Sequence, residues 1–137
     1  MATGLEHLKI YKLAERIEIF IHKLTEKFPK DEKYRMVDQL RRSSNSVTSN
    51  IAEGYGRYSY KEKIRYMYIA RGEAFETKQG LIRSFKKEFY DEEILIFIEN
   101  KITELLKGIN GYINFLKKKE KSTNDSRINQ STKQPSN

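Results

Sequence analysis

Basic and aromatic side chains alternate through the middle of this sequence, between Arg41 and Arg71. Tyrosine rings can stack on nucleobases, while arginine and lysine side chains can hold phosphates. The combination is therefore typical of a nucleic-acid-binding surface. The side chains that we expect to contact nucleic acid are Arg41, Arg42, Arg57, Tyr58, Tyr60, Lys61, Lys63, Arg65 and Arg71.

The distribution of charge supports this interpretation. The formal net charge is +8, and residues 41–71 hold seven basic against two acidic side chains, a net of +5. Residues 117–137 hold six against two, so the rest of the chain is nearly balanced. Clustered positive charge favours a polyanionic partner. A second interpretation stays open, in which Tyr66 and Tyr68 belong to a core or subunit interface and the lysines are merely solvated.

A structural role is also open for some of the polar residues of this stretch. Asn50, Glu53, Arg57 and Arg65 flank an expected turn, where Glu53 is positioned to pair with an arginine. Adjacent residues on a helix project about 100° apart. Arg41 and Arg42 therefore cannot both face one partner, and one of them is a candidate for burial.

Residues for catalysis or metal binding are scarce. The chain has no cysteine, and its two histidines, His7 and His22, are fifteen residues apart, too far for the i, i+4 spacing of a helical metal pair. No nucleotide-binding glycine motif and no tuned nucleophile is present. We therefore expect a protein that is not an enzyme and that needs no metal and no cofactor.

Apolar residues recur at intervals of three and four, which predicts four amphipathic helices. They cover roughly residues 6–27, 31–56, 59–85 and 91–116, with Asp31 as the expected cap of the second. Ser59 and Glu62 form the S-x-x-E pattern of a capping box, which fixes the start of the third helix. That helix carries a second apolar stripe, Tyr68, Phe75 and Ile82, beside its first. The second stripe predicts contact with another subunit.

The second half of the 31–56 helix is rich in serine, threonine and asparagine. These residues have low helix propensity, so this segment either is held by tertiary contacts or breaks near Val47.

These patterns predict an all-α, up-down-up-down antiparallel four-helix bundle formed by residues 1–116. Residues 117–137 are almost without apolar side chains, so we expect a disordered basic tail. No apolar leader and no membrane-spanning stretch occurs, which favours a cytoplasmic location without membrane contact.

Several short segments together resemble one family. They are Leu40-Arg41-Arg42-Ser43-Ser44, then Ser49-Asn50-Ile51-Ala52-Glu53-Gly54-Tyr55-Gly56-Arg57, and then Tyr68-Ile69-Ala70-Arg71-Gly72 with Glu76. In these segments the chain resembles the four helix bundle proteins encoded in 23S rRNA intervening sequences, over about residues 8 to 116.

The resemblance implies a small bacterial cytosolic bundle that assembles as a homopentamer. It also implies kinship with the accessory variability protein of diversity-generating retroelements, which binds nucleic acid and a reverse transcriptase. Arg41, Arg42, Asn50, Glu53, Gly54, Arg57 and Arg71 match the recurrent polar positions of the family. The resemblance assigns no catalytic role to them.

This chain departs from the family pattern at four positions. Ser43 and Ser44 stand where the family usually has alanines, Thr48 where it has proline, and Glu73 where it has a small serine. Without proline at position 48 we expect a straighter second helix. With Glu73 we expect a different subunit contact near the third helix.

The function expected from the sequence is that of a noncatalytic, oligomeric nucleic-acid-binding bundle. It would serve as an RNA or retroelement accessory factor, with a reverse transcriptase as a further partner. The alternative is a protein-interaction scaffold without a direct nucleic-acid role.

Overall fold

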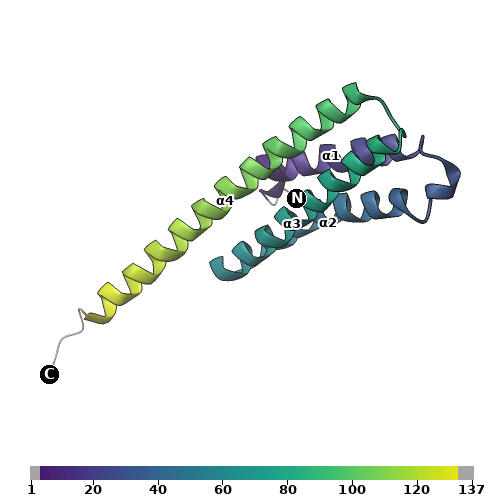
Figure 1. Ribbon diagram of the computed structural model, residues 1–137. Helices are drawn as coiled ribbons and strands as arrows, with labels where there is room; N and C mark the ends of the chain where they lie inside the picture. The colour runs from purple at the N-terminus through teal and green to yellow at the C-terminus, as the bar shows by residue number, and fades with distance from the viewer. Residues whose placement is uncertain (1–3, 133–137) are drawn as a thin grey trace.

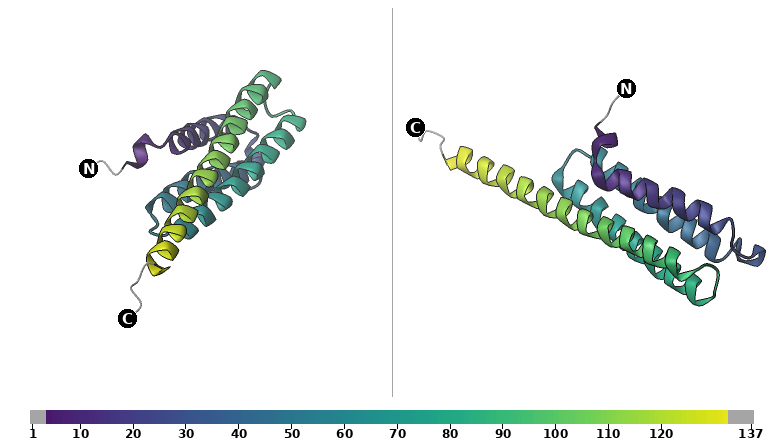
Figure 2. Two further views of the ribbon diagram at one scale, coloured as in Figure 1. Left: turned by 90° about the vertical axis from the view of Figure 1, so that its left-hand side faces the viewer. Right: turned by 90° about the horizontal axis from the view of Figure 1, so that it is seen from above.

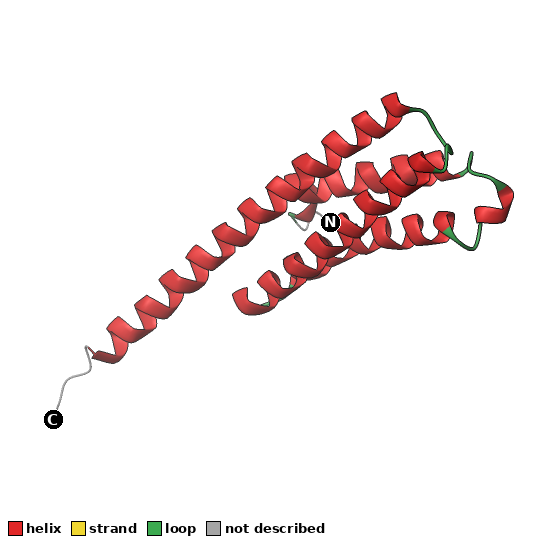
Figure 3. Cartoon of the chain, viewed as in Figure 1, coloured by secondary structure: helices red, strands yellow, loops and turns green. Residues whose placement is uncertain are grey.

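The computed structural model describes residues 4–132, and over this range the chain is an all-α, up-down four-helix bundle without strands (Figure 1). Short loops join the helices at alternate ends (Figure 3). The elements in chain order are the 3-10 helix η1 (Leu5–His7), α1 (Lys9–Thr25), the 3-10 helix η2 (Lys30–Glu32), α2 (Met36–Gly56), α3 (Tyr60–Lys86) and α4 (Glu92–Thr132).

One core runs along the bundle axis, and each helix contributes its apolar stripe to it. Consecutive helices pack together, and α4 closes the bundle by packing against α1. The side chains of Ile21, Leu40, Met67 and Ile109, one from each helix, are fully buried there. Burial of each such side chain contributes about 1.5–3 kcal/mol. The three-four periodicity therefore identified the buried faces correctly.

The connection between α1 and α2 differs from the expected one. Asp31 is not the cap of α2, because η2 occupies that position and α2 begins at Met36. The Glu32 carboxylate instead accepts a hydrogen bond from the Met36 amide at 3.2 Å, which satisfies an N–H at the start of the helix.

The polar half of α2 stays helical through Gly56. Its hydroxyls bond back to carbonyls of the preceding turn, as Ser44 Oγ does to Leu40 O at 2.7 Å. A hydrogen bond of 2.8 Å from Thr77 Oγ1 to Ser43 Oγ links this segment to α3 inside the core. Tertiary contacts therefore hold the segment, and it does not break near Val47.

The start of α3 lies where the capping box predicts it. Ser59 is the N-cap, and its Oγ accepts a hydrogen bond from the Glu62 amide at 3.1 Å. The first apolar stripe of α3 is buried, whereas Tyr68 and Phe75 of the second remain 38% and 52% exposed. The bundle itself does not cover this second face.

The last helix is longer than the sequence suggested. Among the residues up to 129, whose burial the structure describes, Leu116 is the last buried one, which agrees with the expected end of the core. The expected disorder from Lys117 is nevertheless wrong for residues 117–132, because α4 runs unbroken to Thr132. The remaining tail residues, 133–137, lie outside the described residues. Figures 1 and 2 show this extension passing beyond the α2–α3 turn.

Length alone does not make any of these helices a membrane span. In the described part of the chain, even the 41-residue α4 lacks the apolarity that crossing a bilayer needs.

Candidate functional site

The turn between α2 and α3 carries a compact polar network around Arg57. Its Nη2 lies 2.5 Å from Glu53 Oε1 and donates to Tyr66 Oη at 2.8 Å. The guanidinium carbon also lies 4.9 Å from the centre of the Tyr66 ring. Glu53 and Arg57 thus share the network expected from the sequence, but its third member is Tyr66 and not Asn50.

Asn50 and Arg65 do not join Glu53. The Asn50 amide donates to Ser46 O at 2.7 Å, within its own helix. Arg65 lies against the outer side of the network, with its guanidinium carbon 4.7 Å from the Tyr66 ring centre. Its side chain remains exposed, so its charge is available to a partner.

Lys63 is bound within the protein at the same turn. Its Nζ donates to the carbonyl oxygen of Tyr55 at 2.7 Å and lies 5.6 Å from the Tyr55 ring centre. Burial lowers the pKa of the Lys63 ammonium, because desolvation disfavours the charged form. A carbonyl in the last turn of α2 therefore already holds this cation.

Arg41 is also held by the ends of helices. Its Nε donates to Thr25 Oγ1 at 2.9 Å and its Nη2 to His22 O at 3.1 Å, which ties α2 to the C-terminus of α1. Arg42 points away to solvent and pairs with Asp38 at 2.7 Å. The two arginines therefore diverge, and Arg41 is the more buried one.

Arg71 belongs to the surface between α3 and α4. Its Nη1 donates to Asn110 Oδ1 at 2.9 Å, and its guanidinium carbon lies 4.8 Å from the Tyr68 ring centre. Lys117 Nζ approaches the same ring at 5.4 Å. Lys117 belongs to the segment expected to be a disordered tail, so no sequence pattern places it beside Tyr68.

Three of the expected contact residues keep their functional groups fully available. The Tyr58 side chain is entirely in solvent, and Lys61 and Arg65 are exposed in the first and second turns of α3. No carboxylate pairs with Lys61 or Arg65 among residues 4–132. Tyr60 differs, because its ring packs partly buried against the core. The binding of nucleic acid by these residues stays a prediction.

An acidic cleft on the α2–α3 side of the bundle has a separate character. It has a volume of about 430 Å³ and is lined by Glu73, Glu76, Asp38 and Arg42, among others. Burial, and then the neighbouring and hydrogen-bonded Glu76, raise the pKa of the Glu73 carboxyl. Over residues 4–132 no three His, Asp or Glu side chains are placed to hold a metal ion.

Comparison with known proteins places the chain in a family. A crystal structure at 1.70 Å of a protein of unknown function from the S23 ribosomal protein family of Bacteroides thetaiotaomicron superposes with a TM-score of 0.72 and 26% sequence identity. The match covers 77% of this chain and 95% of that one. No match was found among curated proteins. The family model of the 23S rRNA-intervening sequence protein matches residues 6–111, and the chain therefore belongs to this family.

Proposed function

We propose that the protein is a noncatalytic, oligomeric bundle that binds nucleic acid through the N-terminal end of α3 and the turn before it. The observation that carries the proposal is the set formed by Tyr58, Lys61 and Arg65, whose ring and charges have no carboxylate partner in the described chain. We call this set the turn site. A ring in solvent, three residues before the first of two unpaired cations, suits the base and the phosphates of a nucleic-acid strand.

The alternatives to nucleic acid are less well supported at this turn. An acidic protein surface would use the two cations but would gain little from a single ring in solvent. Single exposed aromatic side chains are ordinary on protein surfaces, so the case for a base depends on the cations that follow the ring in the sequence. Base stacking contributes about 1–3 kcal/mol per base, which makes an unpaired base a suitable cover.

The oligomeric part of the proposal depends on the second face of α3. Tyr68, Ile69 and Phe75 leave a third or more of their surface in water, along one side of the helix. A Cβ at Gly72, in the same stretch, would meet no atom within 4 Å, so a second helix has room to approach there. A copy of the chain packed on this face would bury the stripe, and the resemblance to the family suggests five copies.

A reverse transcriptase, or another protein, is a further candidate for this apolar face. A shallow hollow of about 590 Å³ continues the face toward Lys61. Ile64, Tyr68 and Ile69 line it together with Lys61, Glu62 and Arg65, and its exposed surface is mainly apolar, which favours protein contact there over a phosphate backbone. The scaffold function would therefore use α3 as well, at a surface that shares Lys61 and Arg65 with the turn site.

Fluorescence anisotropy with a labelled single strand tests the nucleic-acid part. We expect tight binding at low salt, with log K falling linearly as log salt rises. The Lys61→Gln/Arg65→Gln variant should reduce the magnitude of that slope by about 1.4, because each phosphate contact contributes about 0.7 for single strands. Lys30→Gln/Arg35→Gln is the matched control, since both residues are exposed at the opposite end.

Two results would remove this function. One is the absence of binding by the unmodified protein at low salt. The other is an equal loss in the variant and in the control, which would mean that the turn site contributes only its share of net charge. In either case the scaffold function becomes the better explanation of α3.

A further inference from the structure

The groove between α1 and α4 is lined by cations that come from distant parts of the sequence. It has a volume of about 350 Å³, and Lys9, Lys12 and Arg16 of α1 face Lys101 of α4 across it. Residues 1–40 as a whole are nearly neutral, so the charge count along the chain did not reveal this cluster. Folding concentrates the charge, because neither acidic residue of α1, Glu15 or Glu18, lines the groove.

The three α1 cations are free to bind a ligand. All are exposed, and none pairs with a carboxylate in the stretch 4–132. Glu15, the nearest acid along α1, is outside the groove lining and hydrogen-bonds with Tyr11.

One acidic side chain does line the groove. Glu104 pairs with Lys101 at 3.9 Å, and both side chains are well exposed, at 65% and 43%. Exposed pairs of this kind contribute about 0–1 kcal/mol, so Lys101 can be released to another anion at little cost. The lining therefore has four positive charges against one negative charge.

The spacing of the cations suits a chain of phosphates. Lys9, Lys12 and Arg16 follow one face of α1 at rises of about 4.5 and 6 Å, since each helical residue adds about 1.5 Å. A nucleic-acid strand with stacked bases advances about 3.4 Å per phosphate, so neighbouring cations are one to two nucleotides apart along it.

The floor of the groove is apolar, and the two helices approach closely there. Ile10 and Leu13 line it, together with Gly108 of α4. A Cβ at Gly108 would lie 2.8 Å from Ile10 Cγ2, so glycine lets the two helices approach closely there. A flexible single strand can place its phosphates on the cations while its unpaired bases lie against this apolar floor, which the paired bases of a duplex are not free to do. The groove therefore suits a single strand better than a double helix.

We propose that the α1–α4 groove is a second nucleic-acid site, which binds the phosphodiester backbone of a single strand through Lys9, Lys12 and Arg16. The inference rests on the proposed function, because both require a nucleic-acid ligand. It adds a separate track on a different pair of helices, away from the turn site. A strand bound here is held by its phosphates, so binding is nearly independent of base sequence.

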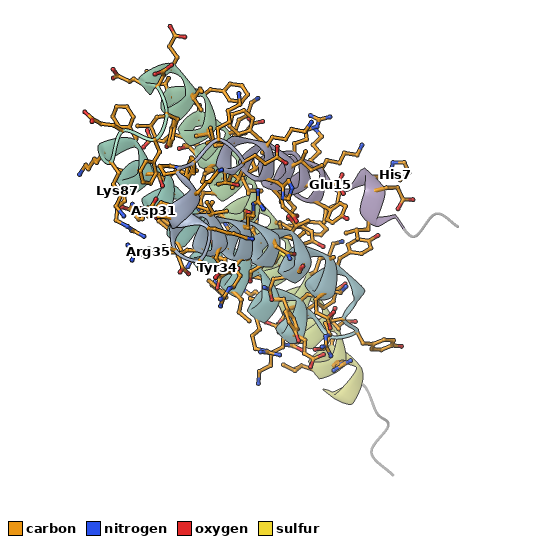
Figure 4. The ribbon with its side chains drawn as sticks, turned by 90° about the vertical axis from the view of Figure 1, so that its right-hand side faces the viewer. His7, Glu15, Asp31, Tyr34, Arg35 and Lys87 are labelled. Carbon is orange, nitrogen blue, oxygen red and sulfur yellow. The ribbon has the colours of Figure 1, made fainter. Side chains whose placement is uncertain are left out.

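The test compares two triple variants of the full chain with a labelled single strand under increasing salt. Lys9→Gln/Lys12→Gln/Arg16→Gln should reduce the magnitude of the log K against log salt slope by about 2, which is three contacts at about 0.7 each. The control Lys30→Gln/Arg35→Gln/Lys87→Gln also removes two lysines and one arginine. Figure 4 shows Arg35 and Lys87 at the end of the bundle opposite His7. This control variant should leave the slope of log K against log salt nearly unchanged.

A charge-preserving variant guards against misfolding. Lys9→Arg/Lys12→Arg/Arg16→Lys should bind like the unmodified protein, and circular dichroism should give the same helicity for all variants. An unlabelled duplex should compete less well than an unlabelled single strand. Polyglutamate at equal charge should compete less well than either.

The outcomes separate this inference from the function on which it rests. If the strand binds and the turn-site variant weakens it, but the groove variant matches its control, the groove is overturned and the proposed function stands. Equal competition by polyglutamate would assign the groove to an acidic protein segment and overturn the inference. Failure of the unmodified protein to bind any strand overturns both.

Discussion

Tyr58 is the residue on which a base-stacking role can be tested most directly. Its ring lies in solvent at the α2–α3 turn and makes no packing contact with the core. Tyr58→Ala should therefore leave stability nearly unchanged. If one base stacks on the ring, affinity for a single strand should fall by about 1–3 kcal/mol, roughly five- to 150-fold.

Tyr58→Phe is the control for this prediction, because it keeps the ring. Anisotropy with the same labelled strand should give unmodified affinity for the phenylalanine variant. An alanine variant that binds as tightly as the parent would show that the ring has no part in binding.

Glu73 provides a prediction about pH. Burial and the nearby Glu76 raise its pKa above the ordinary 4.5, so the folded state binds this proton more tightly than the unfolded state does. Stability therefore falls as pH rises through the interval between 4.5 and the raised value, and the penalty persists at neutral pH. Glu73→Gln should raise the urea midpoint near pH 7 and change it little near pH 4.

Glu104→Gln is the comparison for Glu73, because Glu104 is well exposed and makes only a weak pair with Lys101. Urea midpoints over a pH series should show no comparable gain at neutral pH. A Glu73→Gln midpoint that is lowered equally at both pH values would mean that the carboxylate stabilises the cleft.

Arg41 and Lys63 show what composition cannot reveal about single residues. Both belong to the basic stretch of the sequence, yet carbonyl oxygens of nearby helices accept their hydrogen bonds. The identity of an acceptor depends on which helix ends meet in space, and no spacing along the chain encodes this. Lys61 shows no such partner within residues 4–132 and remains exposed.

At the scale of elements, the α4 extension should be far less protected than the rest of its helix. Beyond Leu116 no side chain of the described extension is buried, and residues 122–126 are poor helix formers. Hydrogen exchange measured by mass spectrometry should show amides 120–129 exchanging much faster than amides 102–113.

Equal protection of the two segments would contradict this prediction. It would mean that another chain packs on the extension in solution. Addition of a single strand should slow exchange in the extension if its lysines take part in binding, since contacts with phosphates would hold the helix.

The four helices were largely predictable from the sequence. The residue at which a helix begins or ends was predictable only where a local sequence motif marks it. The Ser59 capping box placed the start of α3, since one residue pair carries that information. The continuation of α4 past Leu116 was not predictable, because residues 117–129 have no apolar periodicity. The α1–α4 groove was not predictable for another reason: Lys9 and Lys101 are far apart in the sequence and line one groove only after the two helices pack.

For the whole molecule, the second face of α3 predicts self-association. Phe75 is half exposed on that face, and an oligomer would bury it. Sedimentation should show a closed assembly, with five copies the order implied by the family resemblance. Phe75→Asp should shift the protein toward monomer, because the change would bury an unpaired charge at the contact.

Ile128→Asp is the control for the assembly prediction. Ile128 is 60% exposed on the extension, away from Phe75, so its replacement should leave the sedimentation coefficient unchanged. A monomeric parent protein at micromolar concentration would disprove assembly. A stable dimer would keep the buried face but exclude the ring.

The overhang of α4 makes the two ends of the molecule unlike. At one end the helix continues sixteen residues past the core, whereas the other end has only the compact loops that join α1 to α2 and α3 to α4. Rotation about a cyclic axis never exchanges the ends of a subunit, so every overhang in a ring would stand on the same rim. Such a ring would have a front and a back, and a strand arriving at the front would meet a collar of lysine-bearing helices before it reached the bundle.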